Sequence, residues 1–198
     1  MRIQDNNDNV YQLNIIDYSQ FLYQYESVFT HFFRERINFE INQFNIKTPD
    51  YVCYELVDDQ KKVIGLFATY ETMYGVSTMY FSVIHPEYRR LGLYKAFLKF
   101  YIDASKANGL NRITSTHSNS NNPIIIAKMQ YDFYITNLQV CPFFGSQIEL
   151  TYFIDKDMEN IFKFRCGDIS LDQSIAKRFS QPVSAYRKYF DRLNTEIT

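Results

Sequence analysis

The stretch Val83–Leu98, which reads VIHPEYRRLGLYKAFL, decides the fold of this chain. An apolar strand ends at Pro86, a short basic loop with one glycine follows, and an amphipathic helix begins near Leu93. This order aims the backbone N–H groups of the loop and of the first helical turn at whatever lies in front of the strand. Because these N–H groups have no helical partner and the helix dipole favours negative charge, the stretch predicts a phosphate or pyrophosphate site.

Composition excludes several classes of protein. The chain has 198 residues and a formal net charge of −1, so we expect one domain with an appendage and neither nucleic acid nor membrane as a partner. Cys53, Cys141 and Cys166 are far apart, and no His, Cys, Asp or Glu cluster has metal-ligand spacing, so we expect no disulfide framework and no metal. The first residues carry no apolar signal-peptide segment, and no apolar run approaches the ~20 residues that cross a bilayer. These features favour a cytoplasmic protein.

Strand and helix patterns alternate on both sides of the opening stretch. The expected order is a strand, a helix, three antiparallel strands, a helix, a strand, a helix and two closing strands. The strands are expected at Val10–Ile16, Tyr51–Val57, Val63–Tyr70, Ser77–Ile84, Arg112–His117, Phe133–Val140 and Gln147–Ile154. The helices are expected after Asp17 or Ser19 (with apolar residues as far as Phe32, Phe33 and Ile37), from Leu93, and after an N-cap at Asn122. The crossover helix from Leu93 makes the two strands that it joins parallel.

This order and the basic loop resemble the GNAT superfamily of N-acyltransferases. The acyl-CoA loop of that family usually reads Arg/Gln-x-x-Gly-x-Gly/Ala, and this chain has Arg89-x-x-Gly92-x-Tyr94. The resemblance covers about residues 10–155. It implies an α/β (α+β) fold whose mixed, mostly antiparallel twisted sheet is flanked by helices and contains a parallel, splayed central pair of strands. It also implies acetyl-CoA as the acyl donor.

In the family, the pantetheine arm of CoA lies between the splayed strands and the pyrophosphate sits on the loop. Carried over to this chain, the residues implied to bind CoA are Ser82, Val83, Ile84, Arg89, Arg90, Leu91, Gly92, Leu93, Tyr94, Asn121, Asn122 and Lys128. A side chain at Gly92 would push the loop away from the ligand. A tyrosine at position 94 is compatible with main-chain contacts to the phosphates where its side chain points outward.

A second match is the segment 122–133, NPIIIAKMQYDF, which is similar to the family's helix that begins Asn-Pro and ends in Gly-Phe. Alignment on Phe133 places Lys128 where many family members carry a tyrosine that protonates the leaving thiolate. Asp132 replaces the common glycine at the helix end. The resemblance therefore leaves the usual general acid missing.

Three residues are candidates for the general base: His117, Glu71 and Glu55, the last of which lies on the strand Tyr51–Val57. His117 ends the strand beside the expected thioester position, and a histidine that titrates near neutral pH suits proton acceptance from an ammonium group. Glu71 follows the middle strand of the meander. A histidine at a strand end is, however, often only a surface or hydrogen-bonded residue.

Three functions stay open on the sequence. The first is transfer of an acetyl or other acyl group from acetyl-CoA to an amine of a small molecule or peptide by direct attack. The second is a GNAT-like sensor or subunit that binds acyl-CoA with little or no turnover, and the third is an enzyme that makes a longer N-acyl product. In this fold the acceptor is set by segments corresponding to Arg34–Asp50 and Cys141–Gln147, which carry no charge cluster of a single sign.

The chain continues beyond the matched region. We expect a GNAT-like acyl-CoA-binding domain over residues 1–155 and a C-terminal helical extension over residues 156–198 that packs on the core or on a second subunit, as in a homodimer. An apolar stripe at Val183, Tyr186, Phe190 and Leu193 supports this, because so short a helix is marginal in water unless that face is buried. The alternative is a frayed polar terminus.

Overall fold

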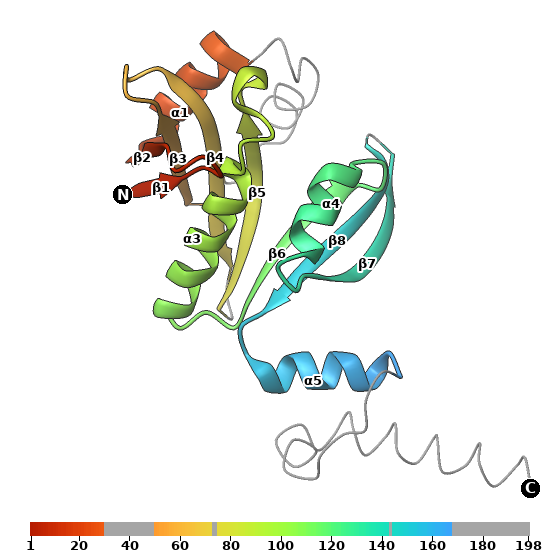
Figure 1. The fold of residues 1–198 in the computed structure, drawn as a ribbon. Coiled ribbons are helices and arrows are strands. Elements are labelled where there is room, and N and C mark those ends of the chain that lie inside the picture. Colours follow the sequence, from red (N-terminus) through yellow and green to blue (C-terminus); the bar gives the residue numbers. More distant parts are fainter. Residues whose placement is uncertain (30–49, 73–74, 143, 168–198) are drawn as a thin grey trace, which may run out of the picture. The chain divides into compact units, whose positions relative to one another are not determined.

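The computed structural model of the chain describes residues 1–29, 50–72, 75–142 and 144–167. Its first compact unit, Met1–Ile154, is built on an eight-stranded sheet in the order β1-β2-β3-β4-β5-β6-β8-β7 (Figure 1). The strands are β1 (Arg2–Gln4), β2 (Val10–Ile16), β3 (Tyr51–Val57), β4 (Val63–Thr72), β5 (Val76–Ile84), β6 (Arg112–Ser118), β7 (Tyr134–Cys141) and β8 (Gly145–Phe153). The helices of this unit are α1 (Tyr18–Gln24), α3 (Leu93–Ala107) and α4 (Asn122–Met129). All strand pairs are antiparallel except β5 with β6.

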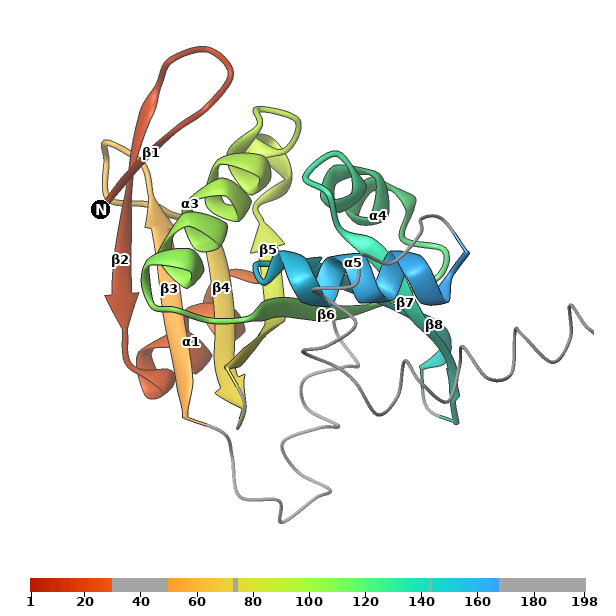
Figure 2. The same ribbon diagram turned by 90° about the horizontal axis from the view of Figure 1, so that it is seen from below.

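Helices cover both faces of the sheet (Figures 1 and 2). On one face, α3 buries Leu93 and Phe97 in the main core, where the ring of Phe97 stacks on that of Phe67 with centroids 3.6 Å apart. On the opposite face, α1 packs Phe21 into a second cluster with Val83. The apolar residues of α3 recur every three to four positions, which is why this helix turns one continuous stripe toward the sheet.

The parallel pair separates after three residues. β5 and β6 pair from Val76 with Arg112 to Thr78 with Thr114, and the remainder of each strand has no partner from the other. The two strands therefore form an open V (Figure 1). The mixed, mostly antiparallel sheet with a splayed parallel pair is confirmed.

A β-bulge in β5 accompanies the splay. Ala68 pairs with Phe81 and Thr69 pairs with Met79, so Tyr80 is an extra residue without a counterpart on β4. The extra residue reverses the side-chain alternation: Met79 lies in the main core on the α3 face, whereas Phe81 packs against the α1 cluster. The part of β5 after the bulge, Phe81–Ile84, therefore does not pair with β6.

Most expected elements are present, with boundaries shifted by one or two residues. Asp17 caps α1 as expected, since its carboxylate accepts the N–H of Gln20 at 2.8 Å. The expected helix continues through a π-helical turn, Tyr25–Phe29, and its remaining apolar positions (Phe32, Phe33 and Ile37) lie outside the described residues. The strand β1 was not expected, because three residues give no periodicity and pairing with β2 holds it.

The predicted N-cap of α4 is wrong by one residue. Asn121 is the N-cap and its side chain makes no capping bond, while Asn122 is already helical. The polar loop before the helix explains the shift: the N–H of Asn121 bonds the carbonyl of Ser118 at 3.0 Å, and the N–H of Asn122 bonds that of Ser120 at 2.9 Å. Backbone turns therefore replace the side-chain cap.

The second unit begins at Asp155. Its described part is α5 (Lys156–Arg165), which lies at the start of the expected helical extension and outside the apolar stripe at residues 183–193. The carboxylate of Asp155 caps this helix by accepting the N–H of Asp157 at 2.9 Å. The apolar stripe at residues 183–193 lies outside the described residues, so the packing of the extension stays a prediction.

Candidate active site

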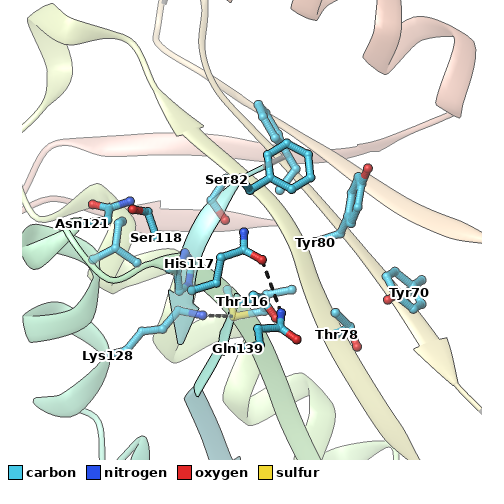
Figure 3. Close-up of a pocket in the computed structure, with 15 residues that line it drawn as sticks. Tyr70, Thr78, Tyr80, Ser82, Thr116, His117, Ser118, Asn121, Lys128 and Gln139 are labelled. Atoms are coloured by element: carbon cyan, nitrogen blue, oxygen red, sulfur yellow. Dashed lines mark hydrogen bonds between the residues drawn. The ribbon is translucent and has the colours of Figure 1, made fainter. Parts of the chain in front are cut away.

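A cavity of about 380 Å³ lies in the opening between β5 and β6 (Figure 3). Consecutive residues of each strand line it, and alternate side chains of a strand point to opposite faces, so the cavity reaches both faces of the sheet. Its lining consists of Tyr70, Thr78, Met79, Tyr80, Phe81, Ser82, Thr116, His117, Ser118, Asn121, Ile124, Lys128, Gln139, Phe144 and Gln147.

The lining is aromatic and neutral-polar. Four rings, from Tyr70, Tyr80, Phe81 and Phe144, contribute to it, and the side-chain amide of Gln139 donates to that of Gln147 at 3.3 Å across the β7–β8 hairpin (Figure 3). None of the described lining residues is acidic. The described walls therefore offer no carboxylate to pair with a cationic ligand.

The loop between β5 and α3 presents backbone donors. It makes one 3₁₀ turn, Pro86–Tyr88, and then passes through two residues with positive φ, Arg90 at 67° and Gly92 at 85°. The N–H of Ala96 bonds the carbonyl of Gly92 at 3.0 Å, which closes the first turn of α3. The preceding N–H groups of that turn lie outside the helical ladder, and such groups suit an anion.

Gly92 has an intramolecular reason to be glycine. A Cβ at this position would lie 2.2 Å from Oδ1 of Asn6, and the N–H of Asn6 donates to the carbonyl of Leu91 at 2.8 Å. The β1–β2 loop thus fills the space beside Gly92, and the positive φ disfavours other residues in any case. Clearance for a ligand, which the sequence pattern predicts for Gly92, is therefore not the sole reason for a glycine here.

Two loop side chains are turned back on the protein. Nε of Arg89 donates to the carbonyl of Ile84 at 3.0 Å, which holds the guanidinium at the end of β5. The outward orientation considered for Tyr94 is not found. Its ring packs against the main core, its hydroxyl is buried without a hydrogen-bond partner among the described residues, and burial raises its pKa. The side chain fills space behind the loop and leaves the main chain in front.

A buried polar cluster closes the other side of the cavity. Nζ of Lys128 on α4 donates to Oγ of Ser115 on β6 and, at 3.5 Å, to Sδ of Met79 on β5. Nε2 of His117 lies 3.1 Å from the same Ser115 Oγ. Lys128 is fully buried, and its ammonium lies 4.9 Å from the centroid of the Phe133 ring.

The pKa values of this cluster differ from those expected from sequence. Burial and the charge of Lys128 lower the pKa of His117 to about 3, so the expected histidine that titrates near neutral pH is a wrong prediction. Burial lowers the pKa of Lys128 to about 7. The group poised near neutral pH is therefore the lysine.

The structure brings some of the expected site residues together and separates others. Ser82, His117, Asn121 and Lys128 all line the cavity. Val83 is instead buried in the α1 cluster, as expected for a strand residue that offers only its backbone. Glu71, at the end of β4, and Asn122 are exposed and do not line the cavity, although both were expected at the site.

Sequence reasoning missed Ser115 and the aromatic lining. The period of a strand places Ser115 on the same face as His117, which was the available signal. The aromatic residues gave none, because the chain contains 17 tyrosines and 18 phenylalanines. Within the described ranges, no group of three or more His, Cys, Asp or Glu side chains could hold a metal ion, and no helix is long and apolar enough to span a membrane.

Comparisons with known proteins agree on the fold. Residues 10–127 match the sequence profile of the acetyltransferase (GNAT) family. No curated protein sequence is significantly similar to the chain.

Among solved structures, the ribosomal-protein-S18-alanine N-acetyltransferase of Escherichia coli is similar with a TM-score of 0.58 and 18% identity, over 73% of this chain and 94% of that one. An IAA acetyltransferase from Bacillus cereus is similar with a TM-score of 0.59 and 13% identity, over 73% of this chain and 99% of that one. A dodecameric spermidine N-acetyltransferase from Vibrio cholerae is similar with a TM-score of 0.57 and 14% identity, over 74% of this chain and 95% of that one. At these identities the likeness shows a shared fold.

Proposed function

This chain belongs to the acetyltransferase (GNAT) family, and from that premise we propose that it moves an acetyl group from acetyl-CoA to an amine of a small molecule or peptide by direct attack. One observation carries the proposal. The cavity between β5 and β6 reaches both faces of the sheet, so a donor and an acceptor can meet inside it from opposite sides. The donor is the one that the family implies, and the acceptor is the open part of the proposal.

The residues present fit acetyl-CoA as substrate. The end of β5, including Ser82, Val83 and Ile84, pairs with β4 on one edge and has no strand on its β6 edge. The backbone groups on that open edge are available to the pantetheine arm. The N–H groups of Arg90, Leu91, Gly92, Leu93 and Tyr94 would hold the pyrophosphate, because they stand at a helix start outside the helical ladder. Arg89 adds positive charge nearby from a position fixed by its bond to β5. On the opposite wall, Asn121 and Lys128 border the arm, and Asn122 is the least supported of the proposed contacts.

The chain's contribution to the chemistry is positioning and proton handling. The acceptor ammonium must lose a proton before its nitrogen can attack the thioester carbonyl. His117 lines the cavity and can receive that proton in passing, since its pKa of about 3 is too low to keep it. Backbone N–H groups of β5 beyond the bulge would stabilise the oxyanion that forms. Holding both reactants in one cavity supplies much of the remaining rate enhancement, and no metal is required.

The cavity favours an acceptor without several positive charges. The similar Vibrio cholerae structure is a spermidine N-acetyltransferase, and a polycation of that kind needs carboxylate partners. The described lining has none and presents aromatic rings with two glutamine side chains instead. We therefore propose a primary amine on an uncharged, partly aromatic molecule, or the N-terminus of a peptide with an apolar first residue.

Binding without turnover is the second candidate, and one observation favours it. Lys128 stands where many family members carry the tyrosine that acts as general acid, and this lysine is fully buried. In that case the chain would be an acyl-CoA sensor or subunit. The third candidate, a longer N-acyl product, draws on the aromatic lining, which could accept an acyl chain.

An amine panel separates these candidates. The protein is incubated with acetyl-CoA and, in turn, tyramine, phenethylamine, an Ala-Phe dipeptide amide and spermidine, and release of CoA thiol is followed together with product mass. We expect turnover with the aromatic amines or the dipeptide and little with spermidine. Binding of acetyl-CoA by calorimetry with no amine acetylated would favour the sensor, and a preference for butyryl- over acetyl-CoA would favour the longer acyl product.

Compartment and assembly belong to the same proposal. We propose a cytoplasmic protein whose segment after Asp155 packs on its own core or on a second copy in a homodimer. Light scattering of the full chain and of a chain that ends at Asp155 tests this. A truncated chain with the same mass per particle and the same melting temperature would make the extension a passive terminus.

A further inference from the structure

Lys128 occupies an unusual position for a lysine. Its exposed fraction is 0%, and no salt bridge neutralises it among the described residues. The groups that face it are neutral: Ser115 and His117 from β6, Met79 from β5 and the ring of Phe133. An isolated charge in such surroundings is costly, so the neutral amine is accessible near pH 7.

The acid on the neighbouring strand β8 lies on the other face of the sheet from Ser115 and His117. Glu149 on β8 stands opposite Thr116 in the sheet register, and its carboxylate accepts the hydroxyl of Thr136 at 3.2 Å. Among the residues that the structure describes, the titratable group linked to the Lys128 ammonium is His117, reached through Ser115.

Ser115 joins the two nitrogen bases. Its hydroxyl is buried, with an exposed fraction of 1% for the residue, and it contacts both Nζ of Lys128 and Nε2 of His117. A hydroxyl both donates and accepts, so this contact can run in either direction. Nδ1 of His117 makes no hydrogen bond within the described part of the chain, while the ring lines the cavity.

We propose that His117, Ser115 and Lys128 form a proton relay in which Lys128 is the final acceptor of the proton that leaves the acceptor ammonium. This inference rests on the proposed amine acetylation for its purpose, and on the geometry of the three side chains for its existence. In this relay His117 is the catalytic residue, because it takes the proton directly from the reacting ammonium. Ser115 and Lys128 act through it.

The relay balances as follows. At the start, Nε2–H of His117 donates to Oγ of Ser115, whose O–H donates to the neutral Lys128 amine. The ammonium of the acceptor gives one proton to Nδ1 of His117, Nε2 releases its proton to Oγ, and the serine proton bonds to Nζ. His117 ends neutral with its proton on Nδ1, and Lys128 ends as the ammonium.

The same chain can run backward after the amide has formed. Two protons leave the ammonium in the overall reaction, and one of them ends on the sulfur of CoA while the other goes to solvent. The relay returns its stored proton through Nδ1 of His117 to the leaving thiolate. The low pKa of His117, about 3, is then no obstacle, because the imidazolium is only a passing state and the proton rests on Lys128, whose pKa is about 7.

The reversal of hydrogen-bond direction gives a test that needs no acceptor. In the full chain labelled with ¹⁵N-histidine and ¹³C-lysine, NMR reports the tautomer of His117 and the protonation of Lys128 from pH 5 to pH 9. We expect His117 to stay neutral and to change from the Nε2–H to the Nδ1–H tautomer as pH falls, with the same midpoint as Lys128. A single tautomer throughout, or two midpoints more than one pH unit apart, would overturn the relay.

Two variants guard against a loss of fold. Lys128→Met should leave His117 in one tautomer at all pH values, and Ser115→Ala should leave Lys128 titrating while uncoupling His117 from it. Circular dichroism checks that each variant is folded. If one of them does not fold, Ser115→Thr replaces it as the test, because it keeps the hydroxyl and should keep the titrations of His117 and Lys128 coupled. A tautomer change that persists in folded Lys128→Met would refute the assignment.

The activity arm uses whichever panel amine is acetylated. Ser115→Ala should lower kcat by about 100-fold and remove the rise of kcat with pH near 7, while KM for acetyl-CoA changes less than threefold. Unchanged kcat and pH profile would show that the relay has no part in catalysis. If no amine is acetylated, the proposed function fails, and the tautomer measurement still decides whether the relay exists.

Discussion

The two walls of the cleft between β5 and β6 are built on different principles. On the α3 side, the loop Arg89–Tyr94 offers main-chain N–H groups, and its side chains are held away from the front, Arg89 on β5 and Tyr94 in the core. On the α4 side, the exposed surface is made by side chains, and a buried cluster of Ser115, His117 and Lys128 stands behind it. The comparison predicts that acetyl-CoA binding depends on the backbone conformation of the loop, whereas proton transfer depends on individual side chains of the cluster.

The largest expected effect on the α4 side is a change with pH in the free energy of unfolding. The pKa of Lys128 is about 7 in the folded chain against 10.5 for an ordinary lysine, so between these values the unfolded chain binds more protons. The free energy of unfolding therefore rises with pH across this window. Relative to Lys128→Met, the wild type should gain about 2 kcal/mol between pH 7.5 and 9.5, measured by urea unfolding. Parallel curves for the two proteins would show that Lys128 titrates normally.

The next effect distinguishes His117 from Glu71 as the general base by their effects on kcat. His117→Gln should lower kcat by about 100-fold, because His117 lines the cavity, and should change the affinity for acetyl-CoA little. Glu71→Gln is the matched control: it is exposed, stands outside the cavity lining and should change kcat less than twofold. The reverse ranking of the two variants would move the base to the end of β4.

The α3 wall should respond to backbone changes. Gly92→Ala adds a Cβ at a φ of 85° and against Asn6, so the loop must shift and acetyl-CoA affinity should fall by about tenfold. Gly109→Ala is the control, because Gly109 has a φ of 71° but nothing within 4 Å of its added Cβ. Calorimetry of both variants and a thermal melt of each separate binding from stability. Equal affinities would show that the loop is not the phosphate site.

The smallest effect concerns charge on that wall. Arg89→Ala should weaken acetyl-CoA binding by about threefold at low salt and less at high salt, since salt screens an exposed charge. Lys99→Ala removes an exposed cation of α3 that is paired with Asp103 at 2.7 Å, and it should have no effect. A larger loss for Arg89→Ala at high salt would mean that its bond to Ile84, and not its charge, maintains the site.

The backbone features of the α3 wall could be predicted from the sequence, whereas the buried side-chain cluster of the α4 wall could not. The strand–loop–helix pattern and the parallel crossover follow from hydrophobic period and helix signals, which are local. The role of Asn6 beside Gly92 is not local, because it depends on β1, a strand that only sheet pairing creates. The family pattern marked Lys128 as a departure, but its burial and its link to His117 through Ser115 depend on how α4 packs over β5 and β6.

The pKa of His117 illustrates the same limit. A sequence assigns a histidine its ordinary value, and only the packed structure shows that burial and a neighbouring cation lower it. The bulge at Tyr80 is a further example, since nothing in the residues of β5 distinguishes a bulged strand from a regular one. Element types were therefore predictable, whereas the exact register and the electrostatics were not.

The most direct test of the account is a crystal structure of the full chain with acetyl-CoA. We expect the pyrophosphate on the N–H groups of residues 90–94, the pantetheine arm along the open β6-facing edge of β5, and the thioester inside the cavity beside His117. A pyrophosphate bound elsewhere, or an arm that does not enter the opening between β5 and β6, would contradict it.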